Sequence, residues 1–143
     1  MTKPVLFLRI ASGLTFIHGV LHTIGGVFGK TGSGAPAIAV AAMKANQFPL
    51  MGNMRTYWDF YHGMGLGVSI SLTADAALFW LLASLARKDA LALRPIMATF
   101  LLAYLALAVN SYTYFFPAPV IVEILIALCL AAAFITAKPK AAA

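Results

Sequence analysis

Four long apolar blocks constrain this chain more than any other feature of its sequence. They cover about residues 4–28, 56–85, 95–115 and 120–137, and each approaches the ~20 residues that cross a hydrocarbon core. Only 10% of the 143 residues are charged and 62% are apolar, so the chain has too few charges to cover a soluble domain. The pattern predicts an all-α fold, a four-helix transmembrane bundle that forms a single integral membrane domain over residues 1–143.

The connections between the blocks are short, except for the first. Within residues 30–54, the stretch 35–46 is apolar but too short to span a bilayer, and it is bounded by Pro36 and Pro49. It predicts a short interfacial helix in the connection between the first two spans. Pro117 and Pro119 predict a tight turn between the third and fourth spans.

The basic residues lie at the ends of the apolar blocks instead of forming a stripe, which argues against a nucleic-acid partner. Their distribution is uneven. One predicted side carries Lys3, Arg9, Arg87, Lys88, Arg94, Lys138 and Lys140, and the other carries Lys30, Lys44 and Arg55. The positive-inside rule then places both termini in the cytoplasm.

Six polar residues share one depth when the sequence is threaded onto this topology. They come from all four spans, in the half away from the termini: His18, His22, Asp59, His62, Asn110 and Glu123. His18 and His22 are four residues apart, and Asp59 and His62 are three apart, so the two members of each pair lie on one face of their helix. Asn110 and Glu123 are equally far from the turn between them, so an antiparallel hairpin brings them level. These residues are our candidate binding site for a ligand or cofactor.

The three histidines make a metal ion the most specific prediction for the bound ligand. His18, His22 and His62 are candidate metal ligands, since imidazole suits zinc, copper or iron. Alternatively, two of them could be the axial ligands of a haem. A structural interpretation is also open, in which Asp59 and Glu123 favour the positive ends of their helices. Three histidines and two carboxylates at one depth favour function, because ionisable residues within spans are costly and rare.

Two other features predict packing. Arg9 and Asp75 lie at similar depths and are expected to pair. Gly63, Gly67 and Ser71 lie on one helix face, which predicts a seam of small residues for close contact between helices.

The first span, LFLRIASGLTFIHGVLHTIGG, resembles the opening of small four-helix bacterial membrane proteins of the DoxX-like type. The shared features are an early Arg, a Gly-rich stretch and a polar residue. The resemblance covers this helix and the four-span plan, and it assigns no functional residue. It implies a location in a bacterial cytoplasmic membrane and an association with membrane redox chemistry.

The sequence therefore predicts a small membrane protein that binds a ligand or cofactor at the polar cluster. One alternative is an enzyme that uses histidine and carboxylate groups to move protons on a lipophilic substrate, such as a quinone or an isoprenoid or sterol-like lipid. Another is a structural subunit of a homo-oligomer or larger membrane complex. Whether the protein is an enzyme stays open at this point.

Overall fold

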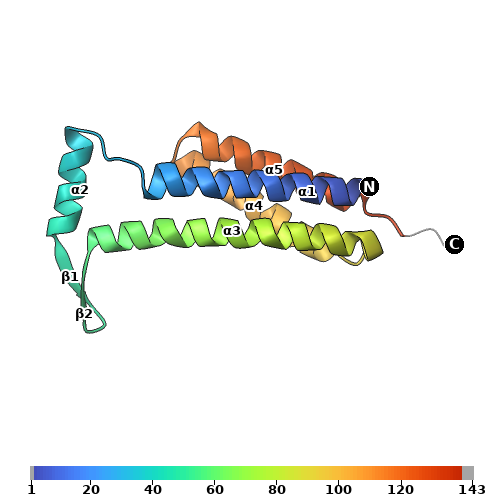
Figure 1. Ribbon diagram of the computed structural model, residues 1–143, viewed down its shortest axis with the longest axis horizontal. Coiled ribbons are helices and arrows are strands. Elements are labelled where there is room, and N and C mark those ends of the chain that lie inside the picture. Colours follow the sequence, from blue (N-terminus) through green and yellow to red (C-terminus); the bar gives the residue numbers. More distant parts are fainter. Residues whose placement is uncertain (1, 140–143) are drawn as a thin grey trace. The chain divides into compact units, whose positions relative to one another are not determined.

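The computed structural model describes residues 2–139, and helices dominate it (Figure 1). In chain order the elements are α1 (Lys3–Leu21), the π-helical segment η1 (His22–Val27), α2 (Ala35–Ala45), β1 (Gln47–Leu50), β2 (Asn53–Thr56), α3 (Tyr57–Asp89), α4 (Arg94–Tyr114) and α5 (Pro117–Thr136). Four of the helical segments are long and apolar enough to cross a membrane, namely Lys3–Val27, α3, α4 and α5. The predicted spans and the short helix between the first two are therefore confirmed.

The boundaries differ from the predicted ones at two places. Helix α5 begins at Pro117, so Pro117 and Pro119 lie in its first turn and do not form a separate tight turn. Proline is tolerated there because the first N–H groups of a helix have no intrahelical acceptor. Helix α3 continues to Asp89 and has 33 residues, about 50 Å at 1.5 Å per residue, which is longer than one straight span needs.

A small hairpin was not predicted. Strands β1 and β2 pair antiparallel, with Gln47 opposite Thr56 and Leu50 opposite Asn53. The two residues between the strands, Met51 and Gly52, have φ values of 47° and 81°. Positive φ at both central residues is the geometry of a type I′ turn, which suits the twist of a two-stranded hairpin.

The chain divides into two compact units. The first contains residues 1–18 and 72–143, and the second contains residues 19–71. The first unit therefore holds most of α1, the second half of α3, and all of α4 and α5. The second unit holds the end of α1, η1, α2, the hairpin and the first half of α3.

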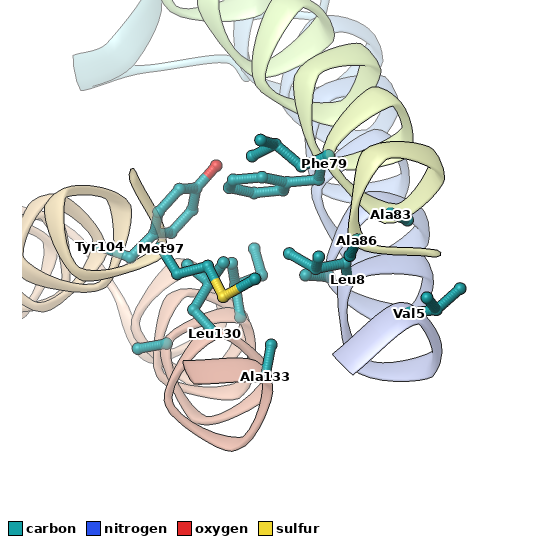
Figure 2. Packing of buried hydrophobic residues seen from close by; sticks show 13 residues of the cluster. Val5, Leu8, Phe79, Ala83, Ala86, Met97, Tyr104, Leu130 and Ala133 are labelled. Atoms are coloured by element: carbon teal, nitrogen blue, oxygen red, sulfur yellow. The ribbon is translucent and has the colours of Figure 1, made fainter. Parts of the chain in front are cut away.

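Four helices pack around one apolar core in the first unit (Figure 2). Leu8 of α1, Phe79 of α3, Met97 of α4 and Leu130 of α5 are each fully buried in it. Several of the buried residues are alanines, including Ala83, which has no exposed surface. Such small residues let helix backbones pack tightly where lipid tails compete for every apolar contact.

Large apolar side chains also cover the outside of these helices. Leu102, Val109 and Ile135 each keep about two thirds of their surface exposed. A protein surrounded by water rarely exposes so much contiguous apolar area. A bilayer removes this cost because the acyl chains are as apolar as the side chains.

Candidate functional site

Polar side chains from all four helices lie inside the first unit. The buried ones are Ser12 and Thr15 on α1, Ser111 on α4 and Glu123 on α5, and α3 adds the partly buried Asp75. Two of the hydroxyls are satisfied by backbone. The hydroxyl of Ser12 donates to the carbonyl of Ala76 at 2.7 Å, and that of Thr15 donates to the carbonyl of Ala11 at 2.9 Å. The other polar groups form two pairs, each joining a hydroxyl to a carboxylate.

Glu123 is the most deeply buried acidic residue among those described, with 5% of its surface exposed. The hydroxyl of Ser111 donates to its Oε1 at 3.0 Å. Its second oxygen, Oε2, is buried and has no hydrogen-bond partner in the described part of the chain. A buried carboxylate oxygen without a donor is costly in an apolar bundle, so this atom is the strongest indication of a ligand.

The residue that faces Glu123 is Ser111 and not its neighbour Asn110. The side chain of Asn110 is exposed, whereas Ser111 is 4% exposed. Successive residues of a helix point about 100° apart, so the residue level with Glu123 across the hairpin need not face it. The distance from the turn predicted which part of α4 lies level with Glu123, but it did not predict which side chain of α4 points toward Glu123.

Asp75 and Arg9 do not form the predicted pair. The hydroxyl of Tyr104 donates to Oδ2 of Asp75 at 3.1 Å. The guanidinium of Arg9 lies 3.2 Å from the ring centroid of Trp80, and its Nη2 donates to the hydroxyl of Ser84 at 3.1 Å. The guanidinium of Arg9 is thus stabilised by a cation–π contact with Trp80 and a hydrogen bond to Ser84, both on α3.

His18 belongs to the first unit and lies on the inward face of α1. It follows Ala11 and Thr15 by seven and three residues, and both of those are fully buried. Its Nδ1 atom is buried as well. His18 and Glu123 are therefore the two predicted site residues that the structure places in the interior of this unit.

His22 belongs to the second unit, where it joins η1 to α3. Its Nε2 lies 3.1 Å from the carbonyl oxygen of Gly65, which can only accept, so Nε2 donates. One turn further along α3, the hydroxyl of Thr23 donates to that of Ser69 at 2.9 Å. A methyl group placed on Gly65 would lie 3.2 Å from Cγ2 of Val27. The close contact therefore runs along the Gly65–Ser69 face.

The predicted seam lies on a different face of α3 from this contact. A methyl group placed on Gly63 or Gly67 would have no atom of another segment within 4 Å among the described residues. The predicted seam of Gly63 and Gly67 is therefore wrong for the second unit, where Gly65 makes the close contact. Spacing of small residues alone could not choose between interleaved faces.

This geometry predicts that Gly65→Val lowers the free energy of unfolding by about 1–3 kcal/mol, because the added methyl groups overpack the contact with Val27. Unfolding of the purified protein in mixed detergent micelles, followed by circular dichroism, measures the change. Gly67→Val is the matched control, since its surroundings are open. Equal losses in the two variants would contradict the assignment of the close face.

His62 is flanked by aromatic rings in the second unit. The ring of Trp58 stacks on it at 5.7 Å, and the ring of Phe28 meets it edge-on at 5.6 Å. Its Nδ1 is buried and has no hydrogen-bond partner among the described residues. If α3 crosses the bilayer perpendicular to its plane, the span of about 20 residues that ends at Arg87 begins near Val68. His62 precedes Val68 by six residues, about 9 Å along the helix axis. We therefore expect His62 at the level of the lipid headgroups.

Asp59 caps the start of α3. Its Oδ2 accepts the backbone N–H of Thr56 at 2.8 Å, while its own N–H donates to the hydroxyl of Thr56 at 3.0 Å. This reciprocal arrangement is a capping box, in which two helix-end donors are satisfied at once. Asp59 therefore has a structural role as part of the helix cap, and the sequence T-x-x-D at residues 56–59 encodes this cap.

The metal interpretation finds no cluster in the structure. Among residues 2–139, no three His, Cys, Asp or Glu side chains lie close enough together to hold a metal ion. His18 belongs to one unit, and His22 and His62 belong to the other. In addition, Nε2 of His22 is used as a donor to Gly65.

Tyr104 and Ser111 are interior residues that sequence reasoning did not select. Tyr104 is 1% exposed and lies at the middle of α4, ten residues from each end. Tyrosines in membrane helices concentrate near the interfaces, so a tyrosine at mid-span was a usable signal. Ser111 gave no comparable signal, because serine within a span is commonly satisfied by its own backbone.

The four apolar helices and the interior of the first unit define a class. The chain is a four-helix integral membrane protein with carboxylate–hydroxyl pairs inside its helical core. The chain matches no known family model, no characterised protein and no solved structure. The resemblance of its first span to DoxX-like proteins stays a prediction.

Proposed function

We propose that this protein binds a lipophilic small molecule inside the first unit, through a hydrogen bond that the molecule donates to Oε2 of Glu123. The observation that carries the proposal is the imbalance at this carboxylate. One oxygen has Ser111 as its donor, and the other is buried with no partner among the described residues. A hydroxyl, amine or amide N–H on a bound molecule would satisfy the second oxygen.

The surroundings favour a lipophilic ligand. Glu123 lies in the second turn of α5, and its neighbours on the inner face, Ile126 and Ala127, are buried apolar residues. The outer faces of the helices are apolar and are expected to contact acyl chains. A molecule with one polar group and an apolar body can reach this depth from the bilayer with little desolvation cost.

A second candidate is proton transfer on such a molecule. The observation that favours it is the repetition of one motif inside the unit. Ser111 donates to Glu123 and Tyr104 donates to Asp75, so two carboxylates each have an adjacent hydroxyl. Carboxyl and hydroxyl groups in a dry interior can accept and return protons at a bound quinol or alcohol. His18, on the inward face of α1, is a further proton carrier of suitable chemistry.

Glu123→Gln tests the binding proposal because it changes little except the unpartnered atom. The amide oxygen can still accept from Ser111, whereas the amide nitrogen cannot accept from a ligand. We expect a compound that co-purifies with the wild-type protein in mild detergent to fall about tenfold or more in the variant. Mass spectrometry of organic extracts, normalised to protein, measures it.

Asp89→Asn is the matched control, since Asp89 lies at the end of α3 and caps the following turn. It should retain the compound. An extract without any stoichiometric compound, or one unchanged by Glu123→Gln, would refute the proposal. An absorption spectrum and metal analysis of the same samples test the metal and haem alternative. A Soret band or a stoichiometric metal lost on His→Ala substitution would support that alternative against ours.

A further inference from the structure

A groove lies among three helix ends of the first unit, separate from the polar interior. It has a volume of about 720 Å³. Its walls come from the start of α1, the end of α3 and the end of α5: residues 2–4, 86–90, 135, 136, 138 and 139. All of these residues belong to one compact unit.

The lining is strongly basic. Four of its side chains are cationic, Lys3, Arg87, Lys88 and Lys138, and Asp89 is the one acidic residue among those that line it. Asp89 is already engaged, because its Oδ1 accepts the backbone N–H of Ala92 at 3.1 Å. The groove thus holds a formal excess of three positive charges, half of the chain's net charge of +6. Like charges gathered in one groove repel each other unless an anion lies among them.

The helix geometry adds to this field. The groove includes the first residues of α1, whose leading N–H groups have no intrahelical acceptor and carry the positive end of the helix dipole. The carbonyl of Thr2 accepts the N–H of Leu6, so the first turn is formed up to the groove. An anion placed there would gain from both the side chains and the dipole.

The position along the helices identifies the kind of anion. The three helix ends are the ends of membrane-crossing segments, and such ends lie at the level of the lipid headgroups. The groove wall also contains Pro4 and Ile135, and Ile135 is 68% exposed. A ligand with a phosphate beside an apolar tail matches cationic groups that lie next to an apolar wall.

We propose that this groove binds the headgroup phosphate of an anionic phospholipid. Lys3, Arg87, Lys88 and Lys138 surround the phosphate, and the first acyl segments pass over Ile135. Basic pockets between membrane helices recognise lipids in this way, and each basic side chain near the surface adds to the attraction. The basic residues at this end of the bundle thus have a binding role in addition to setting topology.

Native mass spectrometry of the purified protein, titrated with dioleoyl phosphatidylglycerol or dioleoyl phosphatidylcholine, tests the proposal. We expect one phosphatidylglycerol to bind at least tenfold more tightly than phosphatidylcholine. The triple variant Arg87→Gln, Lys88→Gln, Lys138→Gln should weaken that binding by about tenfold to a hundredfold. The single variant Arg87→Gln should show a smaller loss in the same direction, so the test does not depend on folding of the triple variant.

The matched control removes the same number of charges from the second unit, in the triple variant Lys30→Gln, Lys44→Gln, Arg55→Gln. It should retain phosphatidylglycerol binding. Equal losses in the two triple variants would overturn the proposal, because the effect would then follow from net charge. Displacement of the lipid by millimolar inorganic phosphate would also overturn it, since the site would then belong to the free anion.

Discussion

Replacing Phe79 with alanine is expected to lower the free energy of unfolding by about 3–5 kcal/mol. The ring has no exposed surface and belongs to the apolar core of the first unit, where it lies beside Tyr104 (Figure 2). It meets Phe100 edge-on at 4.9 Å and lies 5.8 Å from the ring of Tyr104, so it joins α3 to α4. Its removal deletes these contacts and leaves a cavity that the surrounding helices can fill only partly.

Unfolding in mixed detergent micelles, followed by circular dichroism, measures this loss. Leu81→Ala is the control, because Leu81 lies two residues further along the same helix and is 57% exposed. We expect it to cost less than about 1 kcal/mol, since lipid or detergent replaces the contacts of an outward side chain. A Phe79→Ala variant as stable as Leu81→Ala would show that the core does not lie where the structure places it.

Replacing Ser111 with alanine is expected to lower the free energy of unfolding by about 1–3 kcal/mol. The substitution removes the donor to Oε1 of Glu123, whose other oxygen has no protein partner among residues 2–139. A carboxylate at 5% exposure would then have no donor among the described residues. Loss of one member of a buried polar pair costs more than the pair contributes, because the remaining group stays desolvated.

The double variant Ser111→Ala, Glu123→Leu separates this cost from loss of packing. Removing both polar groups should recover most of the stability lost in Ser111→Ala, since no buried carboxylate remains. Ser111→Thr keeps the hydroxyl and should stay near the wild type. The same micelle titration follows all three variants. Additive losses in the double variant would mean that Ser111 and Glu123 do not interact, and the candidate site would lose its geometric basis.

The membrane class and the helix count were readable from the sequence for a local reason. A span requires about 20 apolar residues and little else, so the block lengths indicated the four segments before any packing was known. The short apolar helix Ala35–Ala45 was readable for the same reason, since 11 residues cannot cross a bilayer. The β1–β2 hairpin was missed because its turn, Met51–Gly52, lacks the usual Asn-Gly or Asp-Gly signal.

The distance to the turn predicted the level at which Glu123 meets α4, but not which side chain of α4 faces it. His18 and Glu123 lie in the interior of the first unit, whereas Asn110 points away and Ser111 takes its place. Asp59 forms a capping box with Thr56, which the letters T-x-x-D could have indicated. The predicted Arg9–Asp75 pair was wrong, because Arg9 lies over the ring of Trp80 and Asp75 accepts from the hydroxyl of Tyr104.

The sequence by itself determined that this protein is helical and embedded in a membrane, and where its spans lie. These properties depend on composition and on distance along the chain, and both can be read directly from the sequence. Only the tertiary structure decided which side chains meet, because a rotation of 100° per residue turns neighbours such as Asn110 and Ser111 to different faces. The helices must pack before Oε2 of Glu123 is buried without a partner among the described residues, and before three helix ends form the basic groove.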